Sequence, residues 1–150
     1  MASTSDSNGI VDQRILEYKT LISPRELRES LPRTSKARKT VLHGRKSIED
    51  VLDGKDSRIM VIVGPCSIHN IESAKEYAKR LGELSDKISD KFLVVMRTYF
   101  EKPRTSIGWK GLIYDPDLNG SSNINLGLHL SREFLLSNAE IGLPSATEYQ

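Results

Sequence analysis

Strand-like and helix-like segments alternate along the chain after Gly54, and this alternation constrains the fold more than any other feature. Buried strands are predicted over 58–63, 92–99 and 143–149, and amphipathic helices over 71–89 and 124–138. Strands that are separated by a helix pair in parallel through right-handed crossovers. The pattern therefore predicts an α/β fold with a parallel sheet.

The two helices between the strands carry recognisable start and packing signals. Asn70 is suited to cap the first helix, because its side-chain oxygen can accept a hydrogen bond from a backbone amide. The apolar stripe of that helix is expected to comprise Ala74, Tyr77, Ala78, Leu81, Leu84 and Ile88. The second helix is expected to end at Gly142 and to present on one face Ile124, Leu128, Ser131 and Leu135.

Residues 1–54 lack this alternation and are predicted to form an N-terminal extension, and 55–150 hold the first βα units. The extension is expected to comprise a polar, disordered start (1–9), an extended arm (10–22), a short helix between Pro24 and Pro32, and a longer helix (35–53). The apolar residues of the longer helix recur near the helical period at Ala37, Val41, Ile48 and Leu52. Gly54 then provides its stop.

Composition and charge exclude several classes of protein. The 22 basic and 20 acidic residues leave a net charge of +2, too small an excess to indicate nucleic acid. Eight basic and two acidic residues lie between Arg25 and Lys46, without interleaved aromatics, which favours a solvated face over an anionic partner. No apolar run approaches the roughly 20 residues that span a bilayer. The single cysteine and the absence of a recognisable leader predict a reduced, cytoplasmic, single-domain chain.

Cys66 follows the first predicted strand, at the edge where parallel α/β proteins place their chemistry. Gly64 and Pro65 turn the chain there, so the thiol could serve as a nucleophile or as a soft metal ligand. Position alone favours the alternative, a small buried apolar side chain. His69 lies three residues further on, and capping or surface placement is favoured for it over a metal site.

A cluster of positive charge follows the second strand. It comprises Arg97, Lys102, Arg104 and Lys110, with only Glu101 to offset it. Pro103 disfavours a helix at Lys102, which predicts a loop. Guanidinium and ammonium groups suit a small, doubly anionic metabolite, and an ordinary solvated loop is the alternative.

Glu148 lies at the end of the third predicted strand, where a carboxylate could orient water, relay a proton or hold a cation. Three strands cannot close a barrel, and an eight-fold β/α barrel needs about 250 residues. The chain is therefore either a small open sheet or, as we prefer, the front part of a larger fold.

Two stretches, Val63–His69 and Met96–Ile113, resemble 3-deoxy-D-arabino-heptulosonate 7-phosphate (DAHP) synthase of the microbial type I family with an N-terminal extension. The resemblance runs from about Asp12 to Pro144 and implies the N-terminal, incomplete part of a (β/α)8 TIM barrel. It implies the first step of the shikimate pathway to chorismate and aromatic amino acids. In that step phosphoenolpyruvate, erythrose 4-phosphate and water give DAHP and phosphate, with a divalent metal of the Mn, Fe, Co or Zn type.

The resemblance also implies roles for individual residues. Cys66 matches a metal ligand, and Arg97 and Lys102 match residues that hold phosphoenolpyruvate, with Lys102 near the reacting centre. The segment that receives the aldose phosphate is matched by Pro103, Arg104 and Thr105, and an active-site carboxylate that positions water by Glu148. The family's other metal ligands, a His, a Glu and an Asp, come from later strands.

Two hypotheses of different class follow from this resemblance. One is the synthase activity, with a homo-oligomeric full-length enzyme and a possible aromatic amino acid inhibitor. The other is a truncated, non-catalytic remnant that associates with complete subunits. A related enzyme that acts on arabinose 5-phosphate is disfavoured, because the run from Lys102 to Thr105 matches the erythrose family.

Overall fold

The computed structural model describes residues 18–102 and 107–147. The described elements are α1 (Pro24–Ser30), α2 (Ser35–Leu52), β1 (Ile59–Val63), α3 (Ile71–Lys87), β2 (Phe92–Arg97), α4 (Ile124–Glu140) and β3 (Ser145–Ala146). The predicted alternation of strands and helices is confirmed. The predicted burial of the first strand is wrong, because β1 lies at the edge of the described sheet, with Ile59 62% and Ile62 55% exposed. β2 ends at Arg97, two residues before its predicted end, and the last predicted strand is described only in part. The predicted disordered start lies outside the described residues.

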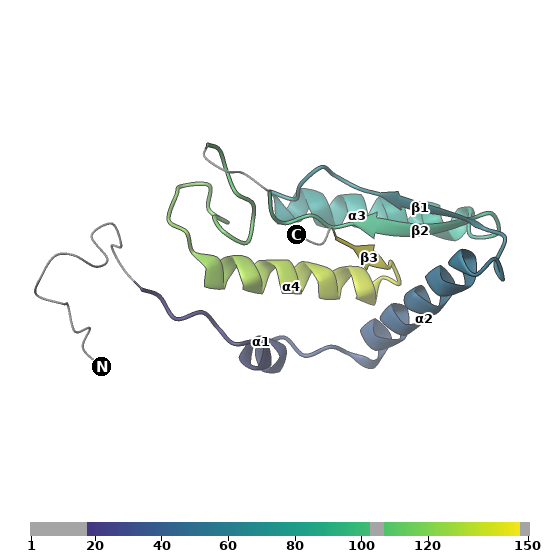
Figure 1. Ribbon diagram of the computed structural model, residues 1–150, viewed down its shortest axis with the longest axis horizontal. Coiled ribbons are helices and arrows are strands. Elements are labelled where there is room, and N and C mark those ends of the chain that lie inside the picture. The colour runs from purple at the N-terminus through teal and green to yellow at the C-terminus, as the bar shows by residue number, and fades with distance from the viewer. Residues whose placement is uncertain (1–17, 103–106, 148–150) are drawn as a thin grey trace, which may run out of the picture.

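The three strands form one parallel sheet in the order β1-β2-β3 (Figure 1). Ile59 pairs with Phe92 at the start of β1, and Met96 pairs with Ser145 where β3 joins. Beyond β2, the amide of Thr98 donates to the carbonyl of Ala146 at 2.7 Å, which extends the pairing toward the carboxyl ends. The predicted parallel α/β class is confirmed. Three strands do not close a barrel, and the eight-stranded barrel stays a prediction.

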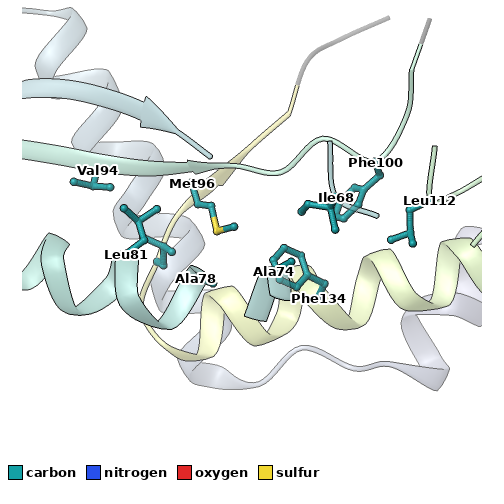
Figure 2. Close-up of a cluster of buried hydrophobic side chains, with 10 residues drawn as sticks. Ile68, Ala74, Ala78, Leu81, Val94, Met96, Phe100, Leu112 and Phe134 are labelled. Atoms are coloured by element: carbon teal, nitrogen blue, oxygen red, sulfur yellow. The ribbon is translucent and has the colours of Figure 1, made fainter. Parts of the chain in front are cut away.

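The core lies between the sheet and the helices α3 and α4, which run below the strands in the close-up (Figure 2). Its buried residues are Ile68, Ala74, Ala78, Leu81, Val94, Met96, Phe100, Leu112, Phe134 and Leu143. The rings of Phe100 and Phe134 meet edge to face, with their centroids 6.1 Å apart. This contact joins α4 to the segment that follows β2, where the cationic cluster was predicted.

The predicted apolar faces of the helices are only partly correct. On α3, Ala74, Ala78 and Leu81 are buried as expected, but Tyr77 and Leu84 are exposed. The expected face of α4 is wrong at Leu135, which is 39% exposed, because the helix instead buries the face that contains Phe134.

Close approach of the backbone explains the orientation of α4. The other buried residues on its inner face are Gly127, Ser131, Asn138 and Ala139. A Cβ atom at Gly127 would overlap the carbonyl of Ile113, so only glycine lets the helix lie against this loop. Small residues therefore select the inner face, and hydrophobic periodicity does not detect them.

Helix α2 shows the same effect. Its buried residues are Ala37, Gly44 and Ser47. The predicted apolar face is confirmed at Ala37 and is wrong at Val41 and Leu52, which are exposed. A Cβ atom at Gly44 would lie 3.0 Å from Cβ of Pro144, which explains why a residue without a side chain occupies this position.

The predicted helix boundaries have the expected chemistry. The amide of Ser73 donates to Oδ1 of Asn70 at 2.8 Å, so the predicted N-cap of α3 is confirmed. Gly54 has a φ of +70° just after α2, in the left-handed region that favours glycine at a helix end.

The part of the extension from Thr20 to Leu31 lies beside α4 (Figure 1). The Asn125 side chain binds it twice, because its Oδ1 accepts from the amide of Ile22 at 2.9 Å and its Nδ2 donates to the carbonyl of Thr20 at 3.1 Å. Arg132 donates from Nε and Nη2 to the carbonyl of Leu31 at 2.9 and 2.7 Å. Two side chains of α4 thus fix the extension through its backbone.

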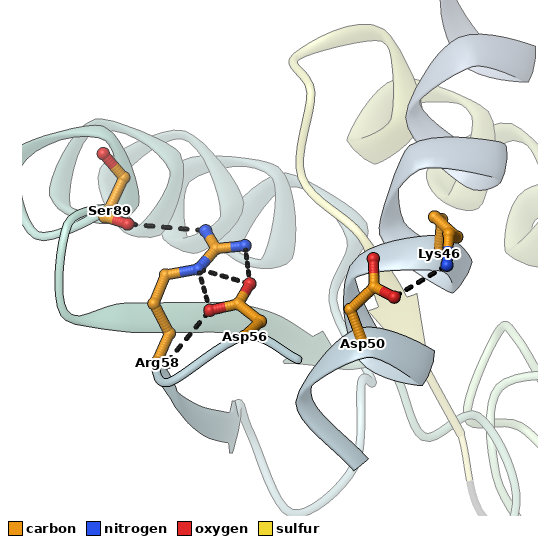
Figure 3. A network of polar contacts seen from close by, with 5 residues as sticks. All are labelled: Lys46, Asp50, Asp56, Arg58 and Ser89. Atoms are coloured by element: carbon orange, nitrogen blue, oxygen red, sulfur yellow. Dashed lines mark hydrogen bonds and ion pairs between the residues drawn. The ribbon is translucent and has the colours of Figure 1, made fainter. Parts of the chain in front are cut away.

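The eight basic residues between Arg25 and Lys46 are all exposed, as expected for a solvated face. Lys46 pairs with Asp50 one turn further along α2 (Figure 3). Among the described helices, none combines the length and the apolar composition required to cross a bilayer.

Candidate anion site at the carboxyl ends of the strands

The loop that leaves β1 crosses close to the end of β2. A Cβ atom at Gly64 would overlap the carbonyl oxygen of Arg97, so this crossing requires glycine. The amide of Ile68 then donates to the carbonyl of Tyr99 at 2.8 Å. Cys66 lies between these two contacts and is exposed, so its interpretation as a small buried apolar residue is wrong.

Three of the predicted site residues meet at this crossing. The ammonium of Lys102 donates to Sγ of Cys66 at 2.8 Å and approaches its carbonyl oxygen at 3.3 Å. The Nη2 atom of Arg97 donates to the same carbonyl at 3.4 Å. Residues separated by more than 30 positions along the chain therefore place two cations and a thiol around one carbonyl group.

Tyr99 supplies a contact that the sequence analysis missed. Its ring centroid lies 4.9 Å from Cζ of Arg97 and 5.3 Å from Nζ of Lys102, so both cations adjoin one aromatic ring. The residue is 3% exposed. The available signal was the spacing, because residues two apart in extended backbone lie on the same side of the chain.

The backbone of Lys102 is held by the returning part of its own loop. Its amide donates to the carbonyl of Lys110 at 2.8 Å, and an isolated antiparallel bridge joins Glu101 to Gly111. The indole of Trp109 donates to the carbonyl of Asp115 at 2.8 Å and anchors the returning segment. The predicted long loop is thus organised around the residue that carries the ammonium.

Other predicted site residues are not part of this arrangement as described. Pro103, Arg104, Thr105 and Glu148 lie outside the described residues. Lys110 is exposed, and its ammonium lies 6.0 Å from the ring centroid of Tyr114. His69 is exposed, in agreement with the surface placement that was favoured for it.

The described residues do not form a metal centre by themselves. Within 18–102 and 107–147, no three His, Cys, Asp or Glu side chains form a group that could hold a metal ion. Cys66 contributes one accessible sulfur, a donor that soft and borderline metals accept. The ammonium of Lys102 donates to that sulfur at 2.8 Å.

The arrangement is suited to binding a small anion. A guanidinium presents a planar set of donors to a carboxylate or phosphate, and an ammonium provides a compact charge beside it. Arg97 and Lys102 donate to the same carbonyl, so one small molecule with two anionic groups could contact both.

A model of the DAHP synthetase I family matches residues 29–150. The chain is 50% identical over 143 residues to the phospho-2-dehydro-3-deoxyheptonate aldolase of Amycolatopsis methanolica, covering 95% of this chain and 70% of that protein. It is 50% identical over 138 residues to the Phe-sensitive phospho-2-dehydro-3-deoxyheptonate aldolase of Escherichia coli, covering 92% of this chain and 39% of the relative.

A solved structure of phospho-2-dehydro-3-deoxyheptonate aldolase from Francisella tularensis superposes with a TM-score of 0.87 at 47% identity. The superposition covers 91% of this chain and 40% of the other, so the chain spans about two fifths of that protein and of the E. coli relative. The matched family model covers the strands, the helices between them and the cationic loop. The chain belongs to the DAHP synthetase I family.

Proposed function

We propose that the protein carrying this chain condenses phosphoenolpyruvate with erythrose 4-phosphate and water, giving DAHP and phosphate. The observation that carries the proposal is the convergence of Arg97, Lys102 and Cys66 at the carboxyl ends of β1 and β2. Both substrates are anionic, so their approach requires fixed positive charge, and two cations at one strand edge supply it. Membership of the DAHP synthetase I family supports the same reaction.

In this proposal Arg97 and Lys102 bind phosphoenolpyruvate. The guanidinium forms paired hydrogen bonds with a carboxylate or phosphate, and the ammonium lies near the carbon that forms the new bond. Pro103, Arg104 and Thr105 receive the phosphate of the sugar, and Glu148 positions the water molecule that enters the product.

Cys66 would be one ligand of a divalent metal ion, with the remaining ligands coming from other parts of the protein. Its exposed sulfur is consistent with that role, since a ligand must be reachable from the site. When bound, the ion would act as a Lewis acid on the aldehyde of erythrose 4-phosphate. The residues described here bind and orient phosphoenolpyruvate whether or not the ion is present.

We place the described sheet as the first three strands of a (β/α)8 barrel, with residues 1–54 as an extension and 55–150 as the first βα units. The parallel order β1-β2-β3 and the similarity to the Francisella structure support this placement. Since E. coli relatives are named Phe-sensitive and Trp-sensitive, we include an aromatic amino acid inhibitor in the proposal.

The test measures phosphoenolpyruvate consumption with erythrose 4-phosphate and Mn²⁺, alongside calorimetric binding of phosphoenolpyruvate alone. We expect binding that is lost in Arg97→Met and Lys102→Met, and consumption that depends on erythrose 4-phosphate and not on arabinose 5-phosphate. Failure of phosphoenolpyruvate to bind would contradict the proposal. Binding without consumption by the purified 150-residue chain would favour the non-catalytic alternative.

A further inference from the structure

Tyr99 contacts both of the cations that bind phosphoenolpyruvate in the proposed function. We propose that it is a positioning residue, whose ring face fixes Arg97 and Lys102 beside Cys66 before an anion binds. The expected effect on phosphoenolpyruvate binding rests on the proposed function. The placement of the Arg97 and Lys102 side chains by the ring of Tyr99 can be tested without any catalytic turnover.

Both cations share two contacts, with the ring of Tyr99 and with the carbonyl of Cys66. Arg97 lies 4.9 Å from the ring centroid of Tyr99 and donates to the carbonyl of Cys66 at 3.4 Å. Lys102 lies 5.3 Å from the same centroid and donates to the same carbonyl at 3.3 Å. The negative face of an aromatic ring attracts cations, and the carbonyl oxygen is the second acceptor. The ring and the carbonyl lie beside both charges, and Lys102 also donates to Sγ of Cys66 at 2.8 Å.

This arrangement matters because the two cations repel each other. Flexible side chains with like charge separate in water, and a binding anion must then pay the entropy of collecting them. Tyr99 is 3% exposed, so surrounding atoms restrict its ring, which offers a fixed surface. A preset pair of charges binds a doubly anionic molecule more tightly than a mobile pair does.

The backbone of Tyr99 has a separate task. Its carbonyl accepts the amide of Ile68 at 2.8 Å and so holds the loop that carries Cys66. A side-chain substitution leaves this backbone bond available. Variants at position 99 therefore test the ring and not the loop connection.

The experiment compares Tyr99→Phe, which keeps the ring, with Tyr99→Leu, which removes it. Tyr114→Leu is the matched control, because it removes an exposed ring near a different lysine, Lys110. Calorimetry with phosphoenolpyruvate should show affinity within about twofold of wild type for Tyr99→Phe and Tyr114→Leu, and about tenfold weaker for Tyr99→Leu. Thermal unfolding of each variant establishes that it folds.

A second series covers the case in which Tyr99→Leu does not fold. Phenylalanines with one, two and three ring fluorines at position 99 keep the shape and progressively weaken attraction to cations. We expect affinity to fall with each fluorine. Equal affinity across the series, or an equal loss in Tyr99→Phe and Tyr99→Leu, would overturn the inference.

Alkylation of Cys66 by iodoacetamide separates this inference from the proposed function. Cys66 is the only cysteine of the chain, so the label reports one site. We expect slower alkylation at a fixed pH as the ring is fluorinated, because Lys102 leaves the sulfur. If wild type binds no phosphoenolpyruvate, the proposed function fails, and the alkylation rate of Cys66 becomes the test of Tyr99. A rate that falls with fluorination supports the positioning role of Tyr99. An unchanged rate refutes it.

Discussion

The Nζ atom of Lys102 lies 2.8 Å from the Sγ atom of Cys66, although 36 positions separate the two residues. Lys102 follows β2 and Cys66 follows β1, so the parallel pairing of the strands brings them together. A positive charge beside sulfur favours the thiolate, which is the form that binds metals and attacks electrophiles.

Lys102→Met should slow the alkylation of Cys66 by iodoacetamide at neutral pH by roughly threefold to tenfold, because it removes the charge and keeps a side chain of similar length. Quantitative mass spectrometry of the labelled thiol measures the rate. Lys110→Met is the control, since that ammonium lies near Tyr114. Equal rates in wild type and Lys102→Met would show that the ammonium does not act on the sulfur in solution.

Gly64→Ala should destabilise the fold by about 1–3 kcal/mol, a typical cost of inserting an atom into a close-packed position. The new Cβ would overlap the backbone carbonyl of Arg97, so the loop carrying Cys66 and the end of β2 must separate. Urea unfolding measures the change. We also expect weaker binding of phosphoenolpyruvate, because the two cations then lose the carbonyl of Cys66.

Gly82→Ala provides the matched control for that substitution. Gly82 lies inside α3, and a Cβ there would be 3.7 Å from Cδ1 of Ile141, an ordinary contact. Alanine favours a helix over glycine, so stability should rise by about 0.5–1 kcal/mol. A loss of stability in Gly82→Ala comparable to that in Gly64→Ala would show that the close approach to Arg97 is not the cause.

The meeting of Cys66 with Arg97 and Lys102 was predictable from the sequence, because carboxyl ends of parallel strands share one edge. The strand β1 and the capped start of α3 were predictable for local reasons, namely an uninterrupted apolar run and Asn70. These features depend on nearest neighbours along the chain or on the one topological rule for strands separated by a helix.

The inner faces of α2 and α4 and the contacts of Tyr99 were not predictable in the same way. At Gly44 and Gly127 the inner face is chosen by how closely another backbone approaches, a quantity that hydrophobicity does not encode. The ring of Tyr99 also adjoins Lys102, three residues further on, a contact that the side-to-side alternation of an extended chain does not predict. Three-dimensional proximity decides these features.

Asp56→Asn should lower the melting temperature at neutral pH, because Arg58 donates to both carboxylate oxygens of Asp56 (Figure 3). Its Nε atom lies 3.1 Å from Oδ1 and 2.9 Å from Oδ2, and its Nη2 atom lies 2.6 Å from Oδ2. These hydrogen bonds hold the pKa of the Asp56 carboxyl below its ordinary value. Arg58 also approaches the carbonyl of Ser89 at 3.4 Å, so the pair connects the start of β1 to the turn after α3.

The difference in melting temperature between wild type and Asp56→Asn should shrink as the pH falls. The folded state holds a proton on Asp56 less readily than the unfolded state does, so the stabilisation is complete above the unfolded pKa of about 3.9. It disappears as the pH falls through the lower folded pKa. The melting temperatures of wild type and Asp56→Asn should therefore converge in acid, and a constant gap would contradict the role of ionised Asp56. Asp90→Asn, at an exposed carboxyl, is the control.

Gly111→Ala should weaken phosphoenolpyruvate binding even though Gly111 carries no functional group. Gly111 has a φ of +119°, and a Cβ there would overlap the carbonyl of Phe100, so alanine must displace the segment that holds the amide of Lys102. Gly120→Ala is the control, because Gly120 also has a positive φ, +76°, but has nothing within 4 Å of its Cβ position. Alanine at position 120 acquires backbone strain of about 1–2 kcal/mol, and alanine at position 111 at least as much, because its φ of +119° lies beyond the left-handed helical region. Calorimetry should show at least a fivefold loss of affinity for phosphoenolpyruvate in Gly111→Ala and no such loss in Gly120→Ala. The difference arises because only Gly111→Ala displaces the segment that positions Lys102. Equal affinity in the two variants would show that backbone strain alone, without displacement of Lys102, accounts for any effect.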